Sequence, residues 1–183
     1  MECVKNPYFS VEFGEEQLGN IRTQIKKVLK YIELSMTDLD NPHISISYVL
    51  GNVNVKTIEE AAEQIVEAPF KMTIRGIEAV ESEYYGGTII SLLLSHTDDF
   101  LYSQEFLKES FANEQVKIKE YSGGFQAHVS LFVLKDLTPK EKKLIPRYIE
   151  VCLLNLGGLE IQGEKFCMYD ENRQKLLEKN FKT

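Results

Sequence analysis

The 183-residue sequence is poor in the residues that usually stabilise small secreted or metal-bound proteins. It contains no tryptophan, three cysteines and three histidines. Three cysteines cannot form an even disulfide framework, and Cys3, Cys152 and Cys167 lack the close spacing of zinc ligands. We therefore expect buried or incidental thiols, and a protein that needs neither a metal nor another cofactor.

The sequence also lacks long apolar runs and low-complexity segments. No run approaches the roughly 20 apolar residues that cross a bilayer, and no basic segment followed by an apolar one opens the chain. The hydrophobic fraction is 43 %, with ten Phe and nine Tyr, which is typical of a globular protein. We expect one domain over residues 1–183, in an intracellular, monomeric protein of the cytoplasm or nucleus that does not contact a membrane.

Positive charge is scarce as well. The formal net charge is −7, which repels a long polyanion unless the basic residues gather on one face. Arg22, Lys26, Lys27 and Lys30 line one side of a predicted helix, and we interpret them as a solvated helix face. The charge favours a short or small phosphate-bearing substrate.

The spacing of apolar residues predicts two successive strand–helix–strand–helix–strand units. The first has strands at 8–13, 43–50 and 70–80 and helices at 15–32 and 55–67; the second has strands at 88–94, 128–134 and 159–168 and helices at 98–111 and 139–154. This order indicates an internal duplication. We predict an α+β fold of two lobes, about 1–82 and 83–183, related by a pseudo-twofold axis, with antiparallel sheets lining a central cleft.

The most informative pattern is a short motif that occurs once in each unit. It reads His43-Ile44-Ser45 in the first unit and His128-Val129-Ser130 in the second. Alternate side chains of a strand share a face, so each histidine points to the same side as its serine, and the apolar residue between them points to the other. The pseudo-symmetry predicts that the two motifs face each other.

Two histidines and two serines suit the cleavage of a phosphodiester. Histidine titrates near neutrality, so His43 and His128 can act as catalytic base and acid without a metal, although the pattern leaves open which is which. Ser45 and Ser130 can bind the phosphate by donating hydrogen bonds to its oxygens. A single His-x-Ser more often holds a buried histidine whose ring nitrogens are hydrogen-bonded within the core, but two matched copies favour catalysis. We interpret His96, which lacks the pattern, as a surface residue.

Further residues are weaker candidates for the site. A strand of period two places Ser47 on the same face as Ser45, where it could shape the pocket. The loop 121–125 lies just before His128 and could form a rim to the cleft. Aromatic residues are more often core or loop residues, but four of them could stack on a nucleobase: Tyr48, Tyr84, Tyr85 and Phe132.

The paired motifs, each inside a repeated unit, resemble those of the 2H phosphoesterase superfamily over nearly the whole chain. Within it the sequence is most similar to the phosphodiesterases that trim the U6 small nuclear RNA 3′ end. That similarity rests on Asn6-Pro7-Tyr8-Phe9-Ser10-Val11, Thr88-Ile89-Ile90-Ser91-Leu92, Gly124-Phe125-Gln126-Ala127-His128-Val129-Ser130 and Gly163-Glu164-Lys165. The chain departs from the family where Gly87-Thr88 replaces an expected threonine-arginine pair.

The resemblance implies metal-independent 3′–5′ trimming of RNA ends. In such a reaction a 2′-hydroxyl at the RNA end attacks the adjacent phosphate and leaves a 2′,3′-cyclic phosphate. Another substrate of the same chemistry is a cyclic or 2′-5′-linked oligonucleotide signal, as in viral enzymes that degrade such signals. A third interpretation is a nucleotide-binding module without turnover. The presence of both histidines and both serines argues against that interpretation.

Overall fold

The computed structural model describes residues 3–32, 34–114, 116–119 and 126–182. The predicted loop at 121–125 lies outside these residues. Every predicted strand and helix is present, within a few residues of its expected bounds. The strands and helices are β1 (Cys3–Lys5), β2 (Tyr8–Phe13), α1 (Glu15–Leu29), the 3-10 turn η1 (Lys30–Ile32), β3 (Met36–Asp38), β4 (His43–Leu50), β5 (Asn52–Asn54), α2 (Val55–Ile65), β6 (Phe70–Ser82), β7 (Gly87–Leu94), α3 (Asp98–Ser110), β8 (Lys117–Ile118), β9 (His128–Leu134), α4 (Pro139–Leu156), β10 (Glu160–Tyr169) and β11 (Lys175–Asn180).

Local sequence explains where the helices begin and which face they bury. Helix α4 starts with a capping box between Thr138 and Glu141, and Pro139 occupies a first-turn position that needs no N–H donor. Helix α1 buries Leu18, Ile21, Ile25 and Leu29, which recur at helical spacing. Within the described part of the chain, no helix combines the length and the apolar composition that crossing a membrane requires.

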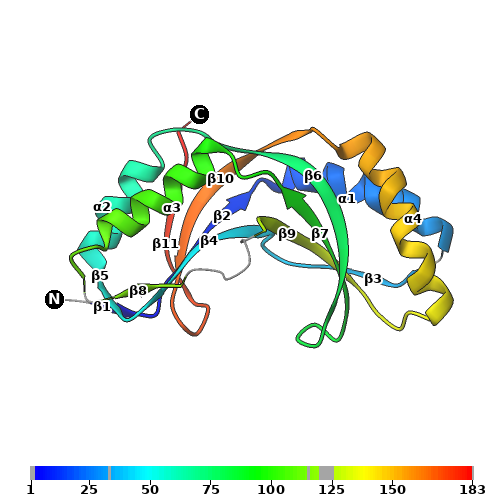
Figure 1. Cartoon of the computed structure of the whole chain (residues 1–183), viewed down its shortest axis with the longest axis horizontal. Coiled ribbons are helices and arrows are strands. Elements are labelled where there is room, and N and C mark those ends of the chain that lie inside the picture. The colour runs from blue at the N-terminus through cyan, green and yellow to red at the C-terminus, as the bar shows by residue number, and fades with distance from the viewer. Residues whose placement is uncertain (1–2, 33, 115, 120–125, 183) are drawn as a thin grey trace.

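One large antiparallel sheet contains nine strands of the described chain. Its order is β3-β9-β7-β6-β10-β2-β4-β8, with β11 paired to β10. Figure 1 shows the sheet as an arch, with α2 and α3 over one half and α1 and α4 over the other. Gly163 lets β10 run close to β2, because a Cβ at this position would lie 2.5 Å from Val11 Cγ1. The α+β class and the antiparallel sheet confirm the prediction.

The predicted lobe boundary near residue 82 is wrong. Strand β6 of the first unit pairs with β7 of the second, and β10 of the second unit pairs with β2 of the first. The helices are exchanged in the same way, since α1 packs against α4 and α2 against α3. The third strand of each unit, β6 or β10, thus pairs with the other unit. This covers an edge of β2 and an edge of β7 that would otherwise be open. Each lobe is therefore built from both halves of the chain.

A β-bulge interrupts both motif strands at the same place. On β4 the register against β2 passes from Ser47 directly to Ser45, and on β9 the register against β7 passes from Phe132 directly to Ser130. An extra residue reverses the alternation of side chains beyond it. Tyr48 therefore faces the cleft together with Ser45.

The bulge also overturns the expectation for Ser47. This residue pairs with Phe9, a fully buried core residue, and is itself buried. The period-two pattern placed Ser47 on the motif face because it could not anticipate the extra residue.

Candidate active site

The segment just before the first motif strand is hydrogen-bonded to the second one. We call residues 39–42, between β3 and β4, the linker. Strand β3 pairs with β9, and just beyond it the Leu39 N–H donates to the carbonyl of Leu131 at 3.0 Å. Four residues later the chain enters β4 at His43. Strands β4 and β9 contact each other although β7, β6, β10 and β2 separate them in the order of the sheet. The curvature of the sheet thus brings the two motifs together, as Figure 1 shows.

Helix α1 holds this linker in place. The Arg22 guanidinium donates to the Leu39 carbonyl at 2.6 Å and to the Glu15 carboxylate at 3.1 Å. Lys26 forms a 2.7 Å ion pair with Asp38 at the end of β3. Arg22 is 8 % exposed, so its assignment to a solvated helix face is wrong. Its charge positions the chain that leads into the first motif.

Both histidines are oriented by the backbone in the same way. The Nδ1 atom of His43 lies 2.9 Å from the carbonyl oxygen of Asn41, and that of His128 lies 3.0 Å from the carbonyl of Gln126. A carbonyl only accepts, so Nδ1 carries the hydrogen in each bond. Nε2 is then the nitrogen at which each ring can accept or release a proton.

The two motifs line one cavity of about 500 Å³, within the usual size range of small-ligand sites. His43, Ser45, His128 and Ser130 all contribute to its wall. The cavity therefore brings together the four residues that the sequence singled out. In the described part of the chain, its charged lining residues are Asp40, Asp170, Glu171, Lys119 and Arg173.

Each motif serine has a hydroxyl neighbour, but the two neighbours differ in kind. Ser45 Oγ lies 3.3 Å from the Tyr48 hydroxyl. Ser130 Oγ lies 3.2 Å from Ser91 Oγ on β7. Both motif serines are half-buried at the cavity wall, where their hydroxyls can reach a bound anion.

Three tyrosines form a row across the sheet beside the first motif. Tyr8 on β2 pairs with Tyr48 on one side and Tyr169 on the other, and its ring stacks on both at centroid distances of 5.3 and 4.7 Å. Burial, together with the neighbouring Tyr48, raises the pKa of Tyr8 to about 12. We call Tyr48, Tyr8 and Tyr169 the tyrosine row. No local sequence signal marks the row, because it depends on the pairing of β2 with both β4 and β10.

The four predicted aromatic residues have different positions. Tyr48 and Tyr85 line the cavity, and the Tyr48 ring also contacts the Lys119 ammonium at 5.9 Å. Tyr84 is 71 % exposed at a hairpin tip, outside the cavity lining. Phe132 is wrong as a stacking residue, because its side chain is fully buried in the core. The bulge on β9 turns it away from the face of His128.

A charged network next to His43 was missed by sequence reasoning. Glu12, which pairs with His43 across β2 and β4, accepts hydrogen bonds from the Tyr169 hydroxyl and from Lys175 Nζ. Burial raises the pKa of Glu12, but the hydrogen bonds from Lys175 and Tyr169 outweigh it and hold the pKa below its usual value. Burial lowers the pKa of Lys175, and its bonds to Glu12 and Glu178 more than reverse this.

The same network answers whether a metal could bind here. Among the described residues, the acidic and thiol groups that lie close enough to share an ion are Glu12, Cys167 and Glu178. Lys175 forms ion pairs with Glu12 at 2.7 Å and with Glu178 at 3.0 Å. The ammonium group already supplies the cation that these carboxylates need.

Two hairpin tips meet across the mouth of the cavity. Arg173, between β10 and β11, donates to the Tyr84 hydroxyl at 2.8 Å, and its guanidinium lies 4.9 Å from the centre of that ring. Tyr84 belongs to the turn between β6 and β7. The Asp170 carboxylate accepts from the Asn172 and Gln174 backbone N–H groups and so shapes the loop that carries Arg173.

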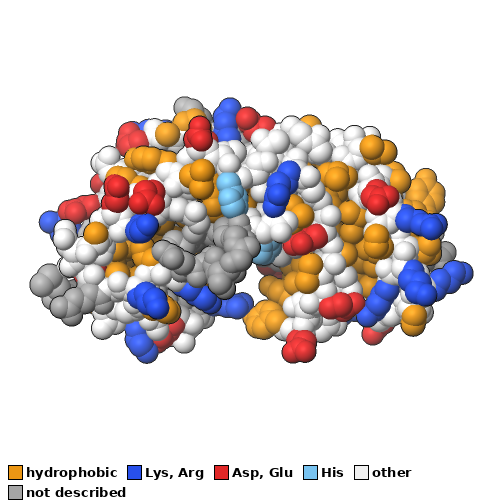
Figure 2. All heavy atoms as spheres, viewed as in Figure 1, with side chains coloured by type: hydrophobic (Ala, Val, Ile, Leu, Met, Phe, Trp, Pro, Cys, Tyr) orange, Lys and Arg blue, Asp and Glu red, His pale blue; other side chains and the backbone are white. Residues whose placement is uncertain are grey.

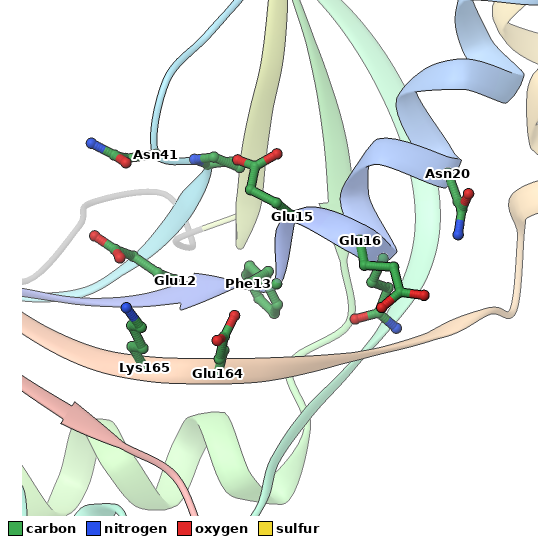
Figure 3. Close-up of a pocket in the computed structure, with 11 residues that line it drawn as sticks. Glu12, Phe13, Glu15, Glu16, Asn20, Asn41, Glu164 and Lys165 are labelled. Carbon is green, nitrogen blue, oxygen red and sulfur yellow. The ribbon is translucent and has the colours of Figure 1, made fainter.

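A second hollow of about 900 Å³ lies beside the first turn of α1 and shares Asn41 and Pro42 with the histidine cavity. Figure 3 shows carboxylates entering it from β2, β10 and α1, with Lys165 beside them. The carboxylates belong to Glu12, Glu15, Glu16 and Glu164. An excess of negative charge disfavours a phosphate there. The histidine cavity is therefore the better candidate for phosphate chemistry.

Among the side chains that Figure 2 colours by type, the basic ones form no continuous stripe across this face. Histidine atoms lie near the middle of this face, and blue and red side chains are intermixed on both sides of them. A long nucleic acid is usually bound by basic residues gathered along one path. This face therefore offers little general attraction to a long polyanion.

Comparison with known proteins finds structural rather than sequence similarity. The sequence matches no protein-family model and no curated protein. The structure of TT0787 from Thermus thermophilus is similar, with a TM-score of 0.58, 16 % identity, and coverage of 96 % of this chain and 97 % of that one. Usb1 of Kluyveromyces marxianus has a TM-score of 0.54 and 9 % identity, covering 97 % and 98 % of the two chains.

LigT of E. coli complexed with 3′-AMP is also similar, with a TM-score of 0.52, 12 % identity and complete coverage of both chains. Identities this low support a shared fold and leave the activity to be argued from the site. The shared arrangement extends over nearly the whole of each chain. The protein therefore shares the fold of these three structures, in agreement with the fold predicted from the paired motifs.

Proposed function

We propose that the protein is a metal-independent phosphodiesterase that cleaves a nucleotide phosphodiester with His43 and His128. One observation carries the proposal: two histidines, each with Nδ1 held by its own backbone, line one cavity together with the serines two residues further on. Each ring can therefore exchange a proton at Nε2. Two-histidine acid–base catalysis needs one such group on each side of a single phosphate.

The reaction we propose is an internal transfer at an RNA 3′ end. The 2′-hydroxyl of the penultimate nucleotide attacks the phosphorus of the last linkage while one imidazole accepts its proton. The 5′-oxygen of the terminal nucleoside leaves and takes a proton from the other imidazole. The P–O2′ bond forms as the P–O5′ bond breaks, so the shortened RNA ends in a 2′,3′-cyclic phosphate.

Ser45 and Ser130 would bind the phosphate in this proposal. Their hydroxyls would donate to the non-bridging oxygens, where negative charge increases in the transition state. Tyr85 is the stacking candidate with the most accessible ring on the cavity wall. Tyr48 would contribute the edge of its ring, since that ring is already in contact with Tyr8 and Lys119.

The cavity charges favour a short substrate. Among the described residues, three acidic and two basic side chains line the cavity, and the whole chain carries −7. This balance suits an RNA end, and it equally suits a small cyclic or 2′-5′-linked oligonucleotide, which we keep as the second candidate substrate. LigT, whose fold is similar, has been crystallised with 3′-AMP, which makes that nucleotide a suitable probe of the cavity.

The test compares substrates on the purified protein in the presence of EDTA. An oligouridine RNA should be shortened from its 3′ end, and the product should carry a 2′,3′-cyclic phosphate. A matched RNA with a 2′-deoxy penultimate nucleotide should resist, because the attacking hydroxyl is absent. Cleavage of the deoxy substrate at the same rate would contradict the internal-transfer mechanism.

Two further outcomes decide the remaining alternatives. Cleavage of cyclic dinucleotides, cyclic trinucleotides or 2′-5′ oligoadenylate without any cleavage of oligouridine would replace RNA trimming by the second candidate. Tight binding of 3′-AMP without turnover of any substrate would identify a binding module. Loss of activity in EDTA would contradict a reaction carried by the two histidines alone.

A further inference from the structure

Each motif serine faces another serine across the sheet. Ser10 on β2 pairs with Ser45, and Ser91 on β7 pairs with Ser130. In both cases the pair lies directly beside the bulge, so the two pairs occupy the same register position of the two half-sheets. Directly opposed side chains of an antiparallel pair have Cβ atoms about 4.5–5.5 Å apart, within reach of a hydroxyl–hydroxyl contact.

Both of these partner serines are buried beneath the motif. Ser10 is 0 % exposed and Ser91 is 3 % exposed. Neither lines the cavity, whereas Ser45 and Ser130 do. A hydroxyl in this position cannot reach a substrate directly, and it can act only through the motif serine above it.

The two partner serines are in different hydrogen-bonding states. Ser91 Oγ lies 3.2 Å from Ser130 Oγ. Among the described side chains, Ser10 Oγ is buried with no hydrogen-bond partner, while Ser45 is directed to the Tyr48 hydroxyl. An unsatisfied buried hydroxyl destabilises a fold, and an alanine at this place would avoid the cost. A buried polar group of this kind requires an explanation.

We propose that Ser10 and Ser91 are positioning residues that hold the motif serines in their phosphate-binding orientation. A serine hydroxyl has one hydrogen to donate and two lone pairs to accept with. When Ser45 turns its hydrogen from Tyr48 toward a phosphate oxygen, its Oγ can accept from Ser10, as Ser130 can from Ser91. Hydrogen bonds in such a chain strengthen one another. The inference rests on the proposed phosphodiesterase function.

The asymmetry between the two pairs adds a specific expectation. The second pair is already formed, whereas the first must form as the anion binds. Ser10 then gains its missing partner only in the liganded state. Its contribution should consequently be seen in turnover and anion binding, and not in the stability of the unliganded protein.

The test measures kcat, KM and the melting temperature of Ser10→Ala and Ser91→Ala on oligouridine RNA. Each variant should lower kcat by about 3–10-fold, the factor that one hydrogen bond corresponds to. KM should change less, and Ser10→Ala should melt at or above the temperature of the unaltered protein. The matched control is Ser47→Ala, which also removes a buried hydroxyl with no partner among the described atoms, but on the core side of β4.

A double-mutant cycle separates positioning from a general packing effect. Ser10→Ala should have no further effect on kcat when Ser45 is already alanine, and Ser91→Ala none when Ser130 is. Unchanged kcat in both single variants would overturn the inference, as would full additivity with the motif variants or an equal loss in Ser47→Ala.

A binding measurement keeps this inference distinguishable from the proposed function. If the unaltered protein cleaves no substrate, the proposed function fails, and inorganic phosphate then serves as the probe. Weaker phosphate binding by Ser10→Ala and Ser91→Ala, with Ser47→Ala unchanged, would still support positioning. Equal phosphate affinity in all four proteins, or no phosphate binding by any of them, would overturn it.

Discussion

Strands β4 and β9 carry the same motif in the same register, but their surroundings on the cleft side differ. In both, the histidine Nδ1 is bonded to the carbonyl two residues earlier, and the motif serine is opposite another serine. The residue opposite the histidine is Glu12 in the first case and Leu93 in the second. The motif histidines and serines are duplicated, whereas the charge beside them is not.

The rows of residues beyond the bulge differ as well. The tyrosine row lies in the half-sheet that carries the first motif. The same register positions in the half-sheet of the second motif form an aliphatic row. The two rows are Tyr48, Tyr8 and Tyr169, and Val133, Ile89 and Val80. Proton transfer and phosphate binding require two equivalent groups, but a base needs a surface on one side only. In the proposed reaction, the symmetric positions would therefore serve catalysis and the asymmetric ones would serve recognition.

The largest effect should come from the symmetric histidines. His43→Ala and His128→Ala should each lower single-turnover cleavage about 10²–10⁴-fold, because each proton transfer needs its own imidazole. The double variant should be little worse than either single one, as expected for residues that act as a unit. His96→Ala, at an exposed position stacked on Phe100, is the matched control. A near-normal rate in one of the two variants would break the equivalence of the halves.

The motif serines come next. Ser45→Ala and Ser130→Ala should each reduce kcat about 10²–10³-fold, the usual result of removing one donor to a developing oxyanion. Steady-state kinetics on the same RNA would measure it, with Ser110→Ala on α3 as control, since its hydroxyl donates to the Phe106 carbonyl of the same helix at 2.8 Å. Unequal losses would show that the phosphate is held mainly by one half.

The asymmetric wall can be tested by exchanging a residue for its counterpart. Tyr48→Val introduces the residue type found at the corresponding position of β9, which is Val133. It should raise KM about 10-fold, within the range of a lost base–aromatic contact. Tyr48→Phe keeps the ring and should hold KM within about threefold of the unaltered value. Removing a cavity-lining side chain of the aliphatic row with Ile89→Ala should have a smaller effect. A larger KM increase for Ile89→Ala would place recognition on the other wall.

The charge beside His43 should affect stability and its pH dependence. Glu12→Gln leaves Lys175 partly buried without its main partner, so the free energy of unfolding at pH 7 should fall by about 1–3 kcal/mol. Because the folded-state pKa of Glu12 is below its ordinary 4.5, this contribution is complete above that pH and is lost as the pH falls through the lower value.

Denaturant unfolding at a series of pH values would measure the contribution of Glu12. The difference between the variant and the unaltered protein should shrink below about pH 4. Glu60→Gln, in an exposed ion pair with Lys56 at 3.4 Å, should cost less than about 1 kcal/mol at any pH. A pH-independent difference for Glu12→Gln would contradict the assignment.

The smallest effect should come from the contact between the hairpin tips. Arg173→Ala removes a hydrogen bond and a cation–π contact at the exposed Tyr84, and it should lower the free energy of unfolding by less than about 1 kcal/mol. Tyr84→Leu should match it if the two residues act only on each other. A much larger loss would show that this contact, and not the sheet, holds the halves together.

The sequence was sufficient for the four helices, for six of the strands and for bringing the four motif residues to one cavity, because period-two and helical spacing are local signals. It missed the strands β1, β3, β5, β8 and β11. It did not predict to which side of the sheet Ser47, Tyr48 and Phe132 point, because that depends on bulges that no local pattern marks. Arg22 was assigned to solvent because its burial depends on the Leu39 carbonyl, which lies on a different element. The partner serines and the tyrosine row depend on strand register, which appears only once the sheet is assembled.

The exchange of third strands has a consequence for how the protein is made. As the chain emerges from the ribosome, β2 and β4 can pair early, but the other edge of β2 stays open until residues 160–169 follow. An unpaired strand edge is the usual starting point of aggregation. Because the strand that completes the half-sheet of β2 and β4 comes from the second half of the chain, the first half cannot complete that lobe on its own. The first motif reaches its final surroundings only after β10 has been made.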